Sequence, residues 1–140
     1  MHFIGMDIHK NYSSVAVTNE RGDLVDRCRL NHRHREELIG YFKQFPYKTQ
    51  VVMEATCGWG WLSELLQDLG LEVKLANPSK VKSIAESQIK TDKVDALALA
   101  QLLRTNFFAG GVFSSSGAER GPGRTALSDR FGLFTEWSKE

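Results

Sequence analysis

Three strand-like segments, joined by links of only a few residues, occupy the start of the sequence and restrict how the chain can fold. They cover residues 3–8, 13–18 and 24–30, where apolar side chains form short runs or alternate with polar ones. The polar turns between them are too short for the crossover that parallel neighbours require. The three segments therefore predict an antiparallel meander.

After the meander, helical and strand-like patterns alternate. Residues 33–45 place their apolar side chains on one helical face and stop near Pro46, and residues 50–55 form a buried apolar run. Further on we expect a helix over 58–69, a strand over 71–76, a short helix over 81–86 and a helix over 92–104. Strands separated by helices imply right-handed parallel crossovers. The order β-β-β-α-β-α-β-α predicts an α/β fold, a mixed sheet with helices on both faces.

The composition is that of one soluble domain. With 140 residues, 41% of them hydrophobic and 25% charged, the chain can bury a proper core. The net charge of +1 is too small to indicate nucleic acid by itself. Cys28 and Cys57 lie far apart and form no CxxC pair, which argues against a disulfide framework or a zinc site. Because no signal peptide or membrane span is visible either, we expect a cytoplasmic protein with no membrane partner.

The last part of the sequence differs in composition from the rest. Gly110 and Gly111 lead into serines at 114–116 and then into Gly121-Pro122-Gly123, which is typical of a flexible linker. We therefore expect a folded domain over residues 1–108 and a flexible tail over 109–140.

Two acidic residues occur at the ends of apolar strands. Asp7 ends the first strand and Glu54 lies near the end of the strand over 50–55, the natural parallel neighbour of the first. Burying a carboxylate is costly unless a positive group meets it, and two carboxylates about 4 Å apart repel by roughly 4 kcal/mol at an effective dielectric of 20. A hard divalent cation, magnesium or manganese, would remove that cost. Salt bridges to Lys10 or Lys90 are the alternative.

A second acidic pair opens the last predicted helix. Asp92 and Asp95 are three residues apart, so they share one face of a helix that Thr91 can cap. Aspartates in a first turn are also ordinary helix chemistry, because the helix dipole favours them. The pair gains a functional meaning only together with the two carboxylates at the strand ends.

Basic residues adjoin these carboxylates. His9 and Lys10 follow Asp7, and Lys90 and Lys93 flank Asp92, so all four are candidates for phosphate contacts. Two basic clusters are either phosphate contacts or a solvated face. They consist of Arg27, Arg29, His32, Arg33, His34 and Arg35, and of Lys74, Lys80, Lys82, Lys90 and Lys93. Trp59 and Trp61 are candidates for stacking on bases, although packing within the fold is the favoured explanation.

Several of these segments resemble a known family. Gly5–Lys10, Met53–Gly58, Asn77-Pro78 and Lys90–Ala96 look like the amino-terminal domain of the DEDD transposases, and they occur in the expected order over about residues 3–107. These insertion-sequence enzymes are related to the Piv/MooV DNA invertases, and some are guided by a bridge RNA. The resemblance implies a RuvC-like, ribonuclease H-like fold.

The resemblance also implies a function. Its catalytic and metal-binding tetrad would be Asp7, Glu54, Asp92 and Asp95. Four carboxylates can hold two Mg²⁺ or Mn²⁺ ions for phosphodiester displacement, here the DNA cleavage and strand transfer of an insertion sequence. The implied partners are DNA, a guide RNA in the guided members, and further copies of the full-length protein. Similar proteins continue into a second catalytic domain with a serine nucleophile, and nothing after Phe107 matches it. We therefore expect a truncated enzyme that cannot carry out transposition alone.

Two other functions fit parts of the pattern. An actin-like phosphotransferase also begins with a strand, an aspartate, a turn and a strand. Its phosphate loop needs glycine, serine or threonine after the aspartate, where this chain has His9 and Lys10. A non-catalytic remnant that binds nucleic acid is the other alternative, and its binding would survive replacement of the aspartates by alanine.

Overall fold

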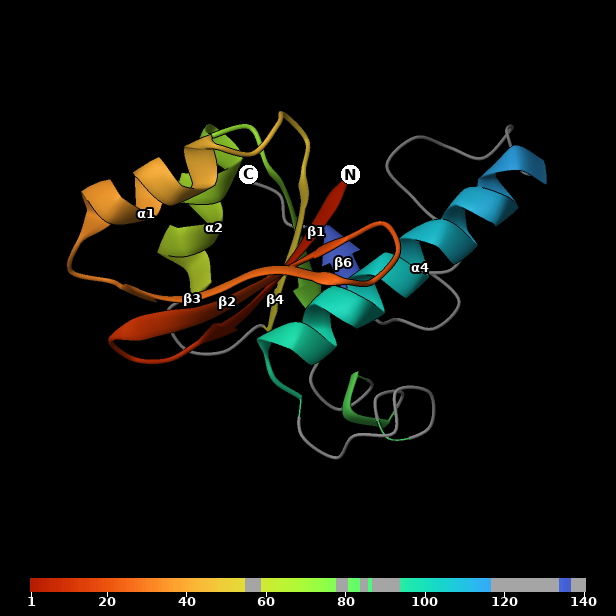
Figure 1. The fold of residues 1–140 in the computed structure, drawn as a ribbon, viewed down its shortest axis with the longest axis horizontal. Helices are drawn as coiled ribbons and strands as arrows, with labels where there is room; N and C mark the ends of the chain where they lie inside the picture. The colour runs from red at the N-terminus through yellow and green to blue at the C-terminus, as the bar shows by residue number, and fades with distance from the viewer. Residues whose placement is uncertain (55–58, 78–80, 84–85, 87–93, 117–133, 137–140) are drawn as a thin grey trace.

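A single mixed sheet forms the centre of the molecule (Figure 1). The computed structural model describes residues 1–54, 59–77, 81–83, 86, 94–116 and 134–136. The strands are β1 (His2–Ile8), β2 (Tyr12–Asn19), β3 (Leu24–Asn31), β4 (Gln50–Glu54), β5 (Glu72–Ala76) and β6 (Phe134–Glu136). The helices are α1 (Arg35–Lys43), α2 (Trp59–Asp68) and α4 (Ala96–Ser116). The six strands lie in the order β3-β2-β1-β4-β5-β6.

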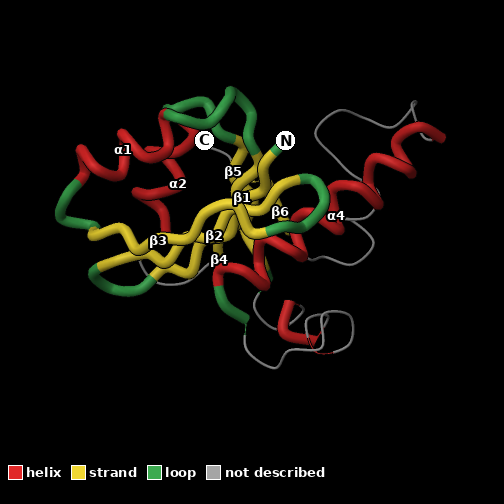
Figure 2. The backbone as a smooth tube through the Cα atoms, viewed as in Figure 1, coloured by secondary structure: helices red, strands yellow, loops and turns green. Residues whose placement is uncertain are grey.

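The first three strands form the predicted antiparallel meander (Figure 2). The turn between β2 and β3 is built locally, because the Asn19 side chain accepts hydrogen bonds from the backbone N–H groups of Arg21 and Asp23. Gly22 takes a φ of +89° in this turn, which glycine adopts without the steric cost that a Cβ atom brings. On the other side of β1 lie β4 and then β5, each parallel to its neighbour, as the crossover pattern predicts.

The larger core lies between the sheet and the helices α1 and α2. Successive side chains of a strand point to opposite faces, so alternate residues of β1, Ile4, Met6 and Ile8, enter this core. Their partners from the helices include Leu38 and Phe42 of α1. The remaining buried members are Val15, Val17, Val51, Met53, Leu62, Leu66, Leu71 and Val73.

The second core lies on the opposite face, beneath α4 (Figure 1). It contains Phe3, Val52, Ala76, Val81, Leu99, Leu102 and Leu103. The predicted α/β fold with helices on both faces is therefore confirmed. Residues 81–83 are helical, as expected for the start of the short helix over 81–86, whereas residues 84 and 85 fall outside the described residues.

Gly5 allows α4 to cross β1 in close contact. A Cβ atom at this position would collide with the backbone carbonyl oxygen of Ala96 and the backbone nitrogen of Ala100. The start of α4 therefore lies directly against the middle of β1. Although α4 is 21 residues long, neither it nor any other helix in the described part of the chain is long and apolar enough to cross a membrane.

The bounds of α4 differ from those predicted, 92–104. The helix begins at Ala96 and is capped by Asp95, whose Oδ1 accepts the backbone N–H of Ala98 at 2.9 Å. Thr91, the predicted cap, lies outside the described residues. The helix also continues through Gly110 and Gly111 to Ser116. A glycine in a helix costs about 1 kcal/mol relative to alanine, so it weakens a helix without necessarily ending it.

Part of the region expected to be a tail therefore forms secondary structure. Besides the last turns of α4, residues 134–136 form β6, which pairs antiparallel with the edge of β5. Composition predicts flexibility from residue 109, but it does not account for the open edge of β5, whose backbone groups can pair with any extended segment. The domain boundary at residue 108 stays a prediction.

Candidate active site

Two of the predicted carboxylates lie on neighbouring strand ends. β1 and β4 are parallel, with Met6 opposite Met53, so Asp7 and Glu54 are the next residues of their strands. Paired residues of adjacent strands point to the same face, and neighbouring strands lie about 4.8 Å apart. Both carboxylates therefore belong to the α4 face, at the end of the sheet where α/β proteins form their sites.

The charges of this pair influence one another. Glu54 is half-buried, and loss of hydration raises the pKa of its carboxyl group; the negative charge of Asp7 raises this pKa further. Both effects disfavour the ionised form of Glu54. A cation between the two groups would relieve the repulsion, so this pair fits the donor set of a hard divalent metal.

His9 is the side-chain partner of Asp7 in the described part of the chain. Its Nε2 lies 3.1 Å from Asp7 Oδ2, a distance at which the Nε2–H form of the ring donates a hydrogen bond to the carboxylate. The same ring stacks on Tyr12, with centroids 4.5 Å apart. Lys10 is exposed, and its backbone carbonyl lies 3.3 Å from His32 Nδ1. The sequence allowed a salt bridge between Asp7 and Lys10. In the structure His9, rather than Lys10, contacts Asp7.

Asp95 reaches the same region from α4. It precedes the first turn of the helix, and its hydrogen bond to Ala98 holds the carboxylate in one orientation. Because Gly5 lets the helix approach β1, Asp95 and Asp7 line one common pocket of about 430 Å³. Tyr12, Ser14, Arg27 and Arg29 contribute to its walls.

The other predicted site residues, Asp92, Lys90 and Lys93, lie outside the described residues. Within the described ranges, no three acidic, histidine or cysteine side chains come close enough to hold a metal ion. The structure thus relates Asp7 to Glu54 through strand pairing and charge, and Asp7 to Asp95 through the pocket. The complete tetrad stays a prediction.

Some residues of the basic and aromatic clusters have structural roles. Trp61 packs at the edge of the larger core, where its ring meets His32 at 5.3 Å and carries the guanidinium of Arg35 at 4.4 Å. Lys74 is buried, with 6% of its surface exposed, which does not suit a surface phosphate contact. Trp59 is the first residue of α2, and its side chain lies outside the description.

Sequence reasoning missed the part played by Tyr12 and Ser14. Ser14 pairs with Asp7 on one side and with Arg29 on the other, so these residues form one row across the sheet. Strand alternation was the available signal, since it predicts which residues of β2 share a face. The pairing partners depend on register, which alternation alone does not specify.

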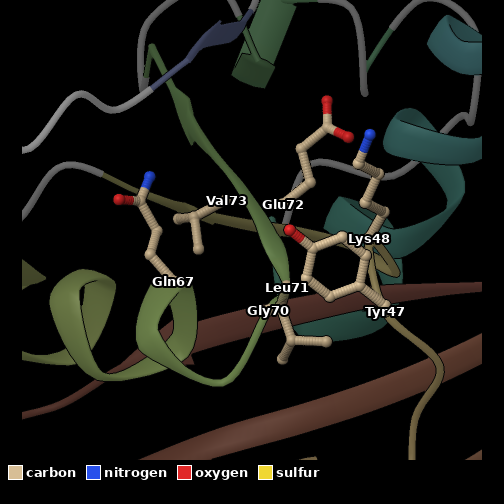
Figure 3. Close-up of a pocket in the computed structure, with 7 residues that line it drawn as sticks. All are labelled: Tyr47, Lys48, Gln67, Gly70, Leu71, Glu72 and Val73. Carbon is tan, nitrogen blue, oxygen red and sulfur yellow. The ribbon is translucent and has the colours of Figure 1, made fainter.

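A second pocket lies at the other end of the sheet (Figure 3). It has a volume of about 350 Å³ and includes Tyr47, Lys48 and Glu72. In Figure 3 the Tyr47 ring lies beside the chain at Gly70, where a Cβ atom would collide with it. This pocket adjoins the beginning of β5 rather than the ends of the parallel strands, so it does not share the carboxylates of the first.

Comparison with known sequences identifies a family. Residues 4–112 match the family described as transposase, of the IS110-type DEDD class. The chain is 27% identical over 107 residues to the transposase for insertion sequence element IS1533 of Leptospira borgpetersenii. This match covers 74% of the chain but only 31% of the relative, so the chain spans about a third of that protein's length.

Comparison with solved structures agrees on the fold. RuvC of T. thermophilus, in complex with a Holliday junction substrate, superposes with a TM-score of 0.51 and 13% identity, covering 98% of this chain and 99% of RuvC. A second Thermus thermophilus RuvC structure gives a TM-score of 0.49 and 14% identity, covering 98% of this chain and 100% of RuvC. At such identity the first likeness shows the fold alone, which is the RuvC-like, ribonuclease H-like arrangement. Since the family match includes well over half of the sequence, the chain belongs to the IS110-type DEDD transposases and contains their RuvC-like domain.

Proposed function

We propose that this chain is the metal-dependent catalytic domain of a DNA transposase, which cleaves DNA and transfers strands of an insertion sequence. One observation carries the proposal: Asp7 and Glu54 occupy adjacent parallel strand ends, on the face where α4 brings Asp95 into the pocket of Asp7. A carboxyl group at a strand end whose pKa is raised by burial and by a neighbouring carboxylate, as that of Glu54 is, is typical of a cation site rather than of a structural ion pair.

The proposed ligands of two Mg²⁺ or Mn²⁺ ions are Asp7, Glu54, Asp92 and Asp95. Bound divalent cations supply Lewis-acid chemistry, in which a phosphate oxygen is polarised and an attacking oxygen is activated. The chain's own residues orient the ligands. His9 holds one oxygen of Asp7, and the backbone of α4 holds one oxygen of Asp95.

DNA is the proposed substrate and partner. Family membership supports this, as does the fold shared with RuvC, whose solved complex contains a Holliday junction. A guide RNA and assembly of several copies are further proposals, and they rest on the family alone. His9, Lys10, Lys90 and Lys93 stay proposed phosphate contacts.

The complete transposition reaction is proposed to need more than this chain. The match covers about a third of the IS1533 relative, and strand exchange requires two DNA partners to be held while bond energy is retained. We expect no recombinant junctions from the 140-residue chain, magnesium and element-end DNA. Junctions that Asp92→Ala abolishes would contradict this expectation.

The site is tested by metal titration of the whole chain and three variants. Mg²⁺ and Mn²⁺ should raise the melting temperature, because the folded site binds ions that the unfolded chain does not. At 100 times Kd the added stability is about 2.7 kcal/mol. Asp7→Asn and Glu54→Gln should abolish the rise. Glu64→Gln is the matched control, since Glu64 is an exposed carboxylate on α2, on the other face of the sheet.

Equal responses of all four proteins to both ions would contradict the metal site. DNA binding that is unchanged in the two site variants, together with such equal responses, would instead favour the non-catalytic remnant. A melting temperature that rises with nucleotide but without DNA would favour the actin-like phosphotransferase.

A further inference from the structure

The α4 face of the sheet is not fully covered by α4. The helix packs on β1, β2 and β4, whereas β3, the edge strand beyond β2, contacts α1 on the other face. A step therefore forms on the α4 face, with the start of the helix on one side and the outward side chains of β3 on the other. The pocket that contains Asp7 and Asp95 lies in this step.

Two exposed arginines form the outer wall of the step. Arg29 and Arg27 face α4's side of the sheet because they pair with Ser14 and Ala16, which in turn pair with Asp7 and Gly5. At about 3.4 Å per residue, the two arginines stand about 6.8 Å apart along β3. Two strand spacings, or about 10 Å, separate Arg29 from Asp7.

A small side chain forms the floor between the arginines and the carboxylates. Ser14 of β2 lies under this path and lines the pocket, so the surface is hollow where a larger side chain would fill it. An extended, negatively charged chain fits such a shallow path, because the arginines along one side attract its charges.

Arg29 is held in place by an aromatic stack that leads to the acid site. Its guanidinium carbon lies 4.2 Å from the centroid of Tyr12, and the same ring stacks on His9. His9 in turn contacts Asp7. In the described part of the chain neither Arg27 nor Arg29 forms an ion pair, so both positive charges remain directed to solvent.

We infer that this path, which we call the β3 track (Tyr12, Ser14, Arg27 and Arg29), binds the sugar–phosphate backbone of a single nucleic-acid strand next to the carboxylates. Arg27 and Arg29 contact phosphates, and Tyr12 orients the guanidinium of Arg29. The track deepens the proposed function, on which it rests, by assigning where the strand lies beyond the scissile phosphate.

The competing explanation is that the arginines only protect an edge strand. Charged side chains on edge strands hinder pairing with other sheets and need no ligand. In that case their replacement leaves nucleic-acid binding unchanged, which the experiment below measures.

The test measures binding of a fluorescent 20-nucleotide thymidine strand to the full chain, in EDTA, at several salt concentrations. Each phosphate contact with a single strand contributes about 0.7 to the slope of log K against log salt. Arg27→Gln and Arg29→Gln should each reduce the slope by about 0.7 and weaken binding about fivefold at 0.1 M salt. Arg29→Lys should keep the slope but weaken binding, because lysine keeps the charge and loses the planar stack on Tyr12.

Arg35→Gln is the matched control. Arg35 is also exposed and also lies over an aromatic ring, that of Trp61, but on the α1 and α2 side of the sheet. Its replacement should change neither affinity nor slope. Melting curves of all variants would show that they are folded, as expected for exposed positions away from both cores.

The outcomes separate the track from the metal site. If Arg27→Gln and Arg29→Gln bind as Arg35→Gln does, or if the unaltered chain does not bind the strand, the track is overturned. Because binding is measured in EDTA, a missing response to Mg²⁺ in the separate titration would overturn only the metal site. Arginine-dependent binding without a metal response would therefore retain the track and reject the catalytic proposal.

Discussion

The side chains of β1 point alternately to two faces of the sheet, which have different environments. Ile4, Met6 and Ile8 point into the core beneath α1 and α2, where Ile4 and Met6 are fully buried. Phe3, Gly5 and Asp7 point to the α4 face. There an aromatic ring packs against the helix, a glycine lets the helix approach, and a carboxylate lies at the open end.

One face of β1 stabilises the fold, whereas the other face carries Asp7, whose charge repels that of Glu54. The first face is filled with large apolar side chains over its whole length, so it supplies stability without polar requirements. The second face changes from apolar at Phe3 to acidic at Asp7, and there the carboxylates raise one another's energy. The stable face offsets the cost of the other. Three variants test this comparison.

The largest expected effect is on the apolar face. Met6→Ala removes a fully buried side chain and leaves a cavity, which costs about 2–5 kcal/mol of unfolding free energy. Chemical denaturation would measure this loss. The response of the melting temperature to Mg²⁺ should persist, because Met6 points away from the carboxylates. A loss of metal response in a variant that is still folded would show that the two faces are not separable.

The second effect concerns the crossing of α4 over β1. Gly5→Ala places a Cβ atom against the backbone of Ala96 and Ala100, which must shift, at a cost of about 1–3 kcal/mol. The shift also moves Asp95 away from Asp7, so the metal response should fall as well. Calorimetric titration with Mn²⁺ would measure it.

Gly40→Ala is the control for this substitution. Gly40 lies within α1 with no atom within 4 Å of an added Cβ, so alanine should stabilise the protein by about 0.5–1 kcal/mol. A Gly5→Ala variant as stable as Gly40→Ala would mean that the close crossing does not hold α4 in place.

The smallest effect concerns the charge of Glu54. The pKa of this group is raised above 4.5 in the folded protein, so the folded state binds its proton more tightly than the unfolded state does. The stability of the metal-free protein therefore falls as pH rises through the raised pKa. Glu54→Gln should remove this dependence and increase stability at pH 7 by about 1 kcal/mol or less, since the group is partly solvated.

Thermal melting in EDTA at several pH values would measure this difference. Well below pH 4.5 the variant and the parent should melt alike, because Glu54 is then protonated in both states. At neutral pH the variant should melt higher, while Glu64→Gln should not. A variant that is less stable at neutral pH would mean that Glu54 has a favourable partner, and the comparison of the two faces would have to be revised.

Much of this architecture was predictable because its signals are local. Short links require antiparallel neighbours, helices between strands imply parallel ones, and the meander and the crossover strands follow from these rules. The positions of Asp7 and Glu54 at strand ends were visible for the same reason. A carboxylate after an apolar run has few explanations, and the family resemblance narrowed them further.

The bounds of α4 were not predictable in the same way. Thr91 and Asp95 are both acceptable caps, and local propensity does not choose between them. The contact of Ala96 with Gly5, which lies some ninety residues earlier in the chain, accompanies the start at Ala96. At the other end, Phe107 packs on Phe3 at 5.3 Å, a tertiary contact that supports the helix beyond the predicted end at Arg104.

By itself, the sequence determined the alternation of side chains along each strand, the order of the elements and the residue types available for a cation site. Only the tertiary structure decided which of these residues meet. Asp7, Ser14 and Arg29 form one row because the register of two antiparallel pairs aligns them, and that register depends on the turn at Gly22 and on a shift between Val17 and Thr18. A displacement by one residue would send Arg29 to the opposite face, which no local preference of the strand itself prevents.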